Sequence, residues 1–218
     1  SSGQNLAKYW MHNGFVNIDS EKMSKSLGNS FFLKDVLKSY SGEIIRFYLM
    51  SAHYRANFNF NEEDLIASKK RLDKIYRLKK RVYATESSNI NKKFQEDIFN
   101  ALNDDINTSK ALSLIDEMIG NANDKLDSNP KDKNLKKELI ANILFVNDIL
   151  GIGYNDAYEY FQFGINESTK VKIEELIKKR NEAKKEKDFA TADALREELT
   201  KMDISLMDTV NGTVWEKL

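Results

Sequence analysis

The apolar positions between residues 61 and 153 recur at the spacing of α-helices. Four segments show this pattern, with apolar residues spread over 65–82, 94–102, 112–126 and 135–150. Asn61 is a suitable N-cap for the first helix, and Pro130 lies in the short polar linker between the third and the fourth. Helices of this length with short connections predict an antiparallel helical bundle over residues 61–153.

Residues 1–60 follow no single period. They mix short aromatic and β-branched runs with a lysine- and serine-rich segment, and they begin in mid-pattern at Asn5–Trp10. The run Glu43–Met50 is apolar enough for a buried helix or a buried strand, and its periodicity does not decide between the two. We therefore expect this region to be part of a larger domain.

Residues 154–218 have the pattern of a linker followed by a small separate module. A helix begins near Val171, and Asp188 is a suitable N-cap for a second helix. Asn211 and Gly212 lie between two strand-like runs, which favours a β-hairpin with both residues at the centre of a type I′ turn. The whole chain is thus predicted to be mainly α, with a small C-terminal α+β module that contains a β-hairpin.

The composition narrows the class of protein. Of the 218 residues, 41% are apolar and 31% are charged, and none is cysteine. The absence of cysteine excludes a disulfide scaffold and any zinc site with thiolate ligands in these residues. The longest mostly apolar stretch, Leu139–Leu150, is interrupted by polar residues, and no secretion signal opens the chain. We expect a soluble, cytoplasmic monomer without membrane helices.

The charges cancel overall but are segregated along the chain. Thirty-four Lys and Arg residues balance thirty-four Asp and Glu residues. Residues 69–93 contain ten basic and two acidic side chains, whereas residues 94–127 contain eight acidic and two basic ones. Such blocks can form a track for a polyanion beside a repelling face. Charge alone, however, favours ordinary solvated helix faces.

The segment Lys22–Asn29 is the most informative in the chain. Two lysines, Lys22 and Lys25, stand three positions apart among hydroxyl side chains, and a glycine follows. A mobile cationic loop of this kind can clamp a triphosphate while negative charge redistributes during attack on the α-phosphate. Hydroxyls and free backbone N–H groups can add contacts to the anion. As a bare pattern the segment is only moderately specific, since similar loops also occur as idle surface.

The same segment resembles the KMSKS signature of class I aminoacyl-tRNA synthetases, and its surroundings are similar to the cysteinyl-tRNA synthetase family. The similar segments are 9–14, 51–55, 59–60, 187–189, 192–193, 208–209 and 212–215, together with Arg196. The resemblance implies three parts. Residues 1–60 would be the C-terminal remnant of a nucleotide-binding α/β catalytic domain, with the KMSKS loop and a region that contacts the tRNA stem. Residues 61–153 would be the helical bundle, and residues 154–218 a linker and an anticodon-binding module.

The resemblance also implies an activity for the complete enzyme. That enzyme would activate cysteine with ATP and Mg²⁺ and then esterify it to tRNA(Cys). In the family, a HIGH signature and the Cys, His and Glu ligands of a Zn²⁺ ion precede the KMSKS loop, whereas this chain contains no HIGH tetrapeptide and no cysteine. We therefore expect no metal site in the chain, Zn²⁺ only in the full-length enzyme, and no catalysis by the isolated chain.

The resemblance assigns the nucleotide contacts to the KMSKS residues. Lys25 would be the principal catalytic residue, because it would stabilise the β- and γ-phosphates as pyrophosphate leaves, and Lys22 would be a weaker second candidate. Met23, Ser24 and Ser26 would join Lys25 in binding ATP.

The anticodon-reading positions that the resemblance implies are Lys184, Phe189, Asp193 and Asp208. Unpaired bases stack on aromatic faces, and carboxylates accept hydrogen bonds from base amino groups. Two positions depart from the commoner family pattern. Lys184 replaces a frequent arginine and lacks its bidentate fork, so its phosphate contact is better supported than base reading. Phe189 replaces a frequent tryptophan and keeps the stacking face without the indole donor.

Several residues and functions keep alternatives. His12 and His53 have no ligand-type partner at metal spacing, so we expect structural roles for both. Arg46 could form an internal ion pair or contact RNA, and Arg55 could contact the tRNA stem. Two alternative functions are a non-catalytic tRNA-binding or scaffolding protein derived from a synthetase, and the related ligase that joins cysteine to an amino-sugar. The second would not need an anticodon module.

Overall fold

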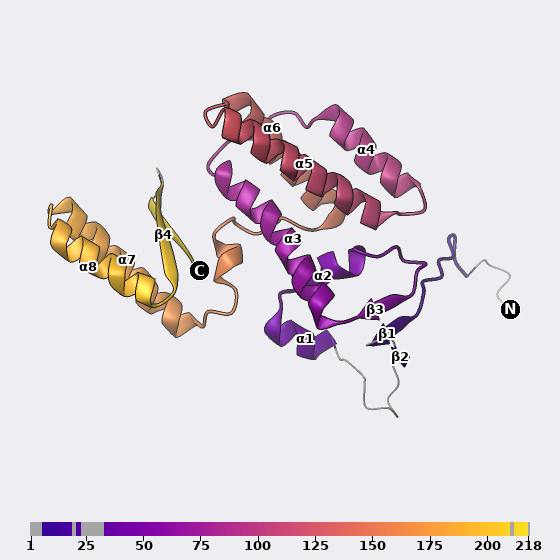
Figure 1. Cartoon of the computed structure of the whole chain (residues 1–218), viewed down its shortest axis with the longest axis horizontal. Coiled ribbons are helices and arrows are strands. Elements are labelled where there is room, and N and C mark those ends of the chain that lie inside the picture. The colour runs from indigo at the N-terminus through magenta and orange to yellow at the C-terminus, as the bar shows by residue number, and fades with distance from the viewer. Residues whose placement is uncertain (1–5, 19–20, 23–32, 210–211, 218) are drawn as a thin grey trace. The chain divides into compact units, whose positions relative to one another are not determined.

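The computed structural model describes residues 6–18, 21–22, 33–209 and 212–217. The chain divides into two compact units, an N-terminal unit, Ser1–Tyr154, and a C-terminal unit, Asn155–Leu218. Figure 1 shows the elements of both units in chain order. None of the helices among these residues is long and apolar enough to cross a membrane.

The N-terminal unit begins with a small sheet and two short helices. Its elements up to the bundle are β1 (Val16–Ile18), β2 (Glu21–Lys22), α1 (Leu33–Ser39), α2 (Gly42–Met50) and β3 (Phe58–Phe60). The strand order is β2-β1-β3, with β1 antiparallel to β2 and parallel to β3. The run over residues 43–50, undecided from sequence, is the helix α2. The Ser41 side chain caps this helix by accepting from the Ile44 backbone N–H.

Four longer helices complete the N-terminal unit. They are α3 (Glu62–Arg81), α4 (Lys92–Asn103), α5 (Thr108–Ser128) and α6 (Lys133–Leu150). Each of the four predicted helical segments is therefore confirmed, and the side chain of Asn61 caps α3 as expected. The side chains of Asn91, Asn107 and Asp132 cap the other three helices. Helix α3 packs against α2, α5 and α6, while α4 lies against α5 and α6 (Figure 1).

A buried carboxylate ties α2 and α3 to the end of α6. Glu43 is only 1% exposed. Its side chain accepts hydrogen bonds from the Tyr76 hydroxyl at 2.8 Å and from the Gly153 backbone N–H. Lys79 donates to the Gly153 carbonyl at 2.9 Å. Arg46, for which an ion pair and an RNA contact were both open, donates to the Leu150 carbonyl at 2.6 Å. Arg46 thus holds the last residue of α6, while Glu43 and Lys79 hold the segment that follows it.

The C-terminal unit packs two helices against a hairpin. Its elements are the 3₁₀ helix η2 (Glu159–Gln162), α7 (Glu167–Lys185), α8 (Phe189–Lys201), β4 (Ile204–Thr209) and β5 (Gly212–Lys217). Its core consists of Ile173, Leu176, Ile177, Leu199, Ile204 and Trp215. Trp215 is 4% exposed, and its indole N–H donates to Glu174. The predicted cap of the second helix is confirmed, since the Asp188 side chain accepts from the Thr191 N–H.

The hairpin is confirmed, but its second strand begins at Gly212, one residue earlier than predicted. Strands β4 and β5 are antiparallel, and Thr209 pairs with Gly212. Gly212 therefore belongs to β5. The prediction that it would occupy the second central position of the turn was wrong. Its φ of +129° still favours glycine. The cross-strand pairing, which a short sequence motif does not specify, sets this register.

Candidate functional site

The nucleotide-binding candidates lie at the edge of the small sheet or beyond the described residues. Lys22 is the last residue of β2 and pairs with Asn17 of β1. Met23, Ser24, Lys25 and Ser26 lie outside the described residues. Their roles in ATP binding and catalysis stay predictions.

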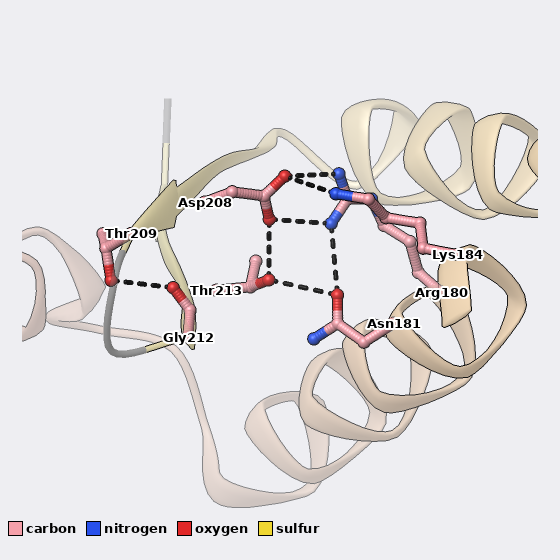
Figure 2. Close-up of polar contacts among 7 residues, drawn as sticks. All are labelled: Arg180, Asn181, Lys184, Asp208, Thr209, Gly212 and Thr213. Carbon is pink, nitrogen blue, oxygen red and sulfur yellow. Dashed lines mark hydrogen bonds and ion pairs between the residues drawn. The ribbon is translucent and has the colours of Figure 1, made fainter.

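Two of the four anticodon candidates meet in a charged network between α7 and the hairpin. The carboxylate of Asp208, in β4, accepts hydrogen bonds from both terminal nitrogens of Arg180, each at 3.0 Å, and from the Lys184 ammonium at 2.9 Å. The Thr213 hydroxyl, opposite Asp208 on β5, donates to the same carboxylate at 2.7 Å. Asn181 also accepts from Arg180, at 3.3 Å. Figure 2 shows Arg180, Lys184 and Thr213 converging on Asp208, with Asn181 in contact with Arg180 and Thr213.

The network differs in burial from one end to the other. The Arg180 side chain is 7% exposed, whereas those of Lys184 and Asp208 are 41% and 46% exposed. Hydrogen bonds from Arg180 and Lys184, with a lesser one from Thr213, hold the pKa of Asp208 well below its usual range against the opposing effect of burial. Each carboxylate oxygen accepts two hydrogen bonds, which fills the acceptor capacity of an ionised carboxylate.

Arg180 was missed by the sequence analysis, although a signal for it was present. It follows Ile173 and Ile177 at positions i+7 and i+3, on the face of α7 that forms the core. A charged residue buried on such a face needs an oppositely charged or hydrogen-bonding partner. The partner itself, 28 residues away on β4, could not be inferred from the periodicity.

Asp208 should make the stability of the C-terminal unit sensitive to acid. Because its pKa is lowered on folding, its stabilising contribution is present above about pH 4 and is lost as the pH falls further. Asp208→Asn should lower the stability at pH 7 and flatten its decline between about pH 4 and pH 2. Thermal unfolding followed by Trp215 fluorescence, in a Trp10→Phe background, would measure this. Parallel declines in the two proteins would contradict the expectation.

The other two anticodon candidates share one face of α8. Phe189 is the first residue of this helix and is 62% exposed, and Asp193 lies one turn later, also exposed. Residues at i and i+4 of a helix are neighbours on its surface. Asp193 has no hydrogen bond or ion pair with another residue that the structure describes, so its carboxylate can accept. An open aromatic face beside an available carboxylate suits an unpaired base.

The basic block of residues 69–93 is partly neutralised within the N-terminal unit. Arg71 of α3 pairs with Asp116 of α5 at 2.8 Å, and Arg81 pairs with Asp127. The two segregated charge blocks therefore meet across the α3–α5 contact. Lys70 and Lys74 are exposed on α3 and form no ion pair with the residues that the structure describes. Lys92, at the start of α4, is likewise exposed and without an ion pair to the described residues, so all three lysines are available to a polyanion.

The other polar candidates are engaged within the chain or isolated. Arg55 pairs with Asp105 at 2.5 Å, and His53 stacks on Tyr54 with ring centroids 5.0 Å apart. The expected structural role fits His53, whereas His12 is exposed and has no hydrogen bond to the described part of the chain, so a structural role for His12 stays a prediction. Within that part, no group of three or more His, Cys, Asp or Glu side chains could hold a metal ion.

Three family models match the chain in succession. The catalytic domain of the class I (C) tRNA synthetases matches residues 1–70, and the DALR domain matches residues 97–155. The cysteinyl-tRNA ligase anticodon binding domain matches residues 169–215. The first matched segment contains Lys22–Asn29, and the third contains the Arg180–Asp208 network.

Curated relatives match along the whole chain. The cysteine–tRNA ligase of Aliarcobacter butzleri is 84% identical over 218 residues, which are 100% of this chain and 47% of that protein. The cysteine–tRNA ligase of Helicobacter pylori is 59% identical over 215 residues, which are 99% of this chain and 46% of that protein. The chain therefore spans about half the length of the curated relatives it matches.

A solved structure shares the fold over part of the chain. It is the ternary complex of Agrobacterium radiobacter LeuRS with tRNA and LeuAMS, with a TM-score of 0.53 and 18% identity over 64% of this chain and 21% of that one. The first family model is that of the class I tRNA synthetases, and the solved structure shares the mainly helical fold. Within that class, the chain belongs to the cysteine–tRNA ligase family. The comparisons give no support to the two alternative functions.

Proposed function

We propose that this chain provides the KMSKS loop and the tRNA-binding region of a cysteine–tRNA ligase. The complete enzyme activates cysteine with ATP and Mg²⁺ and transfers it to tRNA(Cys). The observation that carries the proposal is the succession of catalytic, DALR and anticodon-binding models along one chain. Cytoplasmic location and a monomeric state belong to the same proposal.

In this proposal the KMSKS segment acts on the triphosphate. Attack of the cysteine carboxylate on the α-phosphorus forms the adenylate and breaks the bond to the leaving pyrophosphate. Lys25 stabilises the negative charge that develops on the β- and γ-phosphates, with Lys22 as a second cation. Met23, Ser24 and Ser26 bind ATP alongside Lys25. The described residues do not fit a Zn²⁺ site, so selection of the cysteine thiol is assigned to none of them.

The RNA contacts fall into two kinds. Lys70 and Lys74 on α3, and Lys184 on α7, contact phosphates and carry no sequence information. Phe189 stacks on an anticodon base and Asp193 accepts from a base amino group. Asp208 belongs to the same site through its contact with Lys184, since donors within the chain already fill its acceptor positions. Burial, pairing and exposure of these side chains support the assignments.

Removing the two available lysines of α3 should weaken tRNA binding without changing anticodon preference. Each phosphate contact contributes about 0.7 to 0.9 to the slope of log K against log salt. Lys70→Ala/Lys74→Ala should therefore lower that slope by about 1.4 to 1.8, equally for tRNA(Cys) and an anticodon-substituted transcript. Binding measured across a salt series would test this and, with it, the proposed function.

A matched control is available in the acidic block. Lys110→Ala/Lys125→Ala removes the same charge from α5, where neither lysine forms an ion pair with described residues and acidic neighbours disfavour RNA. This variant should keep the wild-type salt slope. An equal loss in both double variants, or a loss for one anticodon only, would contradict the assignment of α3 as a phosphate track. Failure of the wild-type chain to bind any tRNA would contradict the proposed function.

A further inference from the structure

Arg180 is a buried cation to which the proposed function gives no task. Its side chain is 7% exposed, too little for direct contact with RNA. Burying a guanidinium is costly unless it is paired and hydrogen-bonded. It is paired here with Asp208, which is itself 46% exposed and lies next to the candidate phosphate-binding Lys184.

The two cations hold Asp208 in different ways. Arg180 forms two parallel hydrogen bonds with it, one to each carboxylate oxygen, at 3.0 Å. Lys184 forms a single bond, to one oxygen, at 2.9 Å, and its side chain is 41% exposed. A bidentate buried pair is fixed in geometry, whereas a single bond from a flexible, half-exposed lysine can be exchanged. Lys184 is therefore the member of the network that can leave.

The charges explain why the second cation matters. Arg180, Lys184 and Asp208 together carry one net positive charge. Without Arg180, departure of Lys184 would expose an unpaired negative charge on Asp208. That carboxylate would repel the incoming phosphate and attract the Lys184 ammonium back. Because Arg180 stays bound, Asp208 remains neutralised after Lys184 has moved. Thr213, at 2.7 Å, helps to keep the carboxylate in place.

We propose that Arg180 is a positioning residue of the RNA-binding site, which keeps Asp208 neutralised and fixed so that the Lys184 ammonium is available to an RNA phosphate. The inference rests on the proposed function, because it needs RNA at this surface. It assigns Asp208 the part of a fixed counter-ion. It predicts that Arg180, which does not itself touch RNA, affects the salt dependence of RNA binding.

The test is a set of salt series for tRNA(Cys) binding to the whole chain. Lys184→Met should lower the slope of log K against log salt by about 0.7 to 0.9, the contribution of one phosphate. Arg180→Met should lower it by the same amount, because Lys184 then becomes the only cation on Asp208 and stays there. Arg180→Met/Asp208→Asn should restore the wild-type slope, since Lys184 is free again. Asp208→Asn can restore a phosphate contact only if the contact belongs to Lys184.

The controls separate positioning from folding. Lys170→Met removes a cation from the other end of α7, where Lys170 pairs with Glu167, and it should leave the slope unchanged. Arg180→Gln keeps an amide N–H donor but loses the charge and the bidentate fork, so it serves if Arg180→Met does not fold and should give the same reduced slope. Circular dichroism checks the fold of every variant.

Three results would overturn the inference. One is a wild-type slope in a folded Arg180→Met or Arg180→Gln variant, while Lys184→Met still loses one phosphate; the proposed function would then survive. A second is a double variant that folds but keeps the reduced slope. A third is that neither Arg180→Met nor Arg180→Gln folds while Arg180→Met/Asp208→Asn does. The Arg180–Asp208 pair would then be purely structural. Loss of all tRNA binding by the wild-type chain would overturn the proposed function as well.

Discussion

Glu43→Ala should lower the free energy of unfolding of the N-terminal unit by about 3 to 5 kcal/mol. The substitution leaves the Tyr76 hydroxyl and the Gly153 N–H without their acceptor, and Tyr76 is 0% exposed. Each buried donor without a partner costs about 1 to 3 kcal/mol. The cavity left by the side chain adds to this loss. Urea unfolding followed by circular dichroism would measure it.

Two further variants would test the origin of this loss. Glu43→Gln keeps one carbonyl acceptor and should lose less stability than Glu43→Ala. Glu63→Ala removes an exposed glutamate from the first turn of α3 and should cost less than about 1 kcal/mol, the usual value of a charge near a helix N-terminus. A loss below about 1 kcal/mol for Glu43→Ala would show that the Glu43 side chain does not hold α2 and α3 to the segment after α6.

Lys25→Ala in the full-length ligase should slow adenylate formation by about 10²- to 10³-fold, while ATP binding changes much less. The proposed role of Lys25 is to stabilise charge that develops only as pyrophosphate leaves. A group that acts in the transition state affects the rate more than ground-state affinity. Removing one preorganised donor of this kind typically costs about 10²- to 10³-fold. Single-turnover adenylation at several ATP concentrations separates the two effects.

Lys38→Ala is a suitable control for this experiment. Lys38 lies in α1, pairs with Asp35 at 2.7 Å and is exposed, so its removal should leave both parameters unchanged. An unchanged single-turnover rate in Lys25→Ala would mean that the KMSKS-like segment has no part in the chemistry. A rise in the ATP dissociation constant that accounts for the whole effect would assign Lys25 to substrate binding instead.

The helical bundle could be predicted from the sequence because its determinants are local. The side chain of Asn61 caps the helix that starts after it, and helical periodicity extends over each of the four segments. The run over residues 43–50 could not be assigned in this way. Its conformation depends on the Ser41 cap and on burial against α3, and apolar content alone does not reveal either.

The site was only partly predictable, for a related reason. The resemblance named Lys184 and Asp208, but their contact and the part of Arg180 depend on pairing between residues 24 to 28 positions apart. The charge blocks were visible in the sequence, yet Arg71 and Asp116, 45 positions apart, neutralise one another only in the folded unit. Sequence patterns therefore overstated the basic surface and missed the buried cation beneath the lysine.

The contact between Glu43 and Gly153 also bears on how the chain folds during synthesis. These residues are 110 positions apart, so the ribosome must add that whole stretch before the carboxylate can reach the Gly153 N–H. At about 5 to 20 residues per second, this takes about 5 to 20 seconds. Throughout that interval the carboxylate lacks the Gly153 donor, and its burial is costly until all its partners exist. We therefore expect the packing that buries Glu43 between α2 and α3 to be completed only after α6 has emerged.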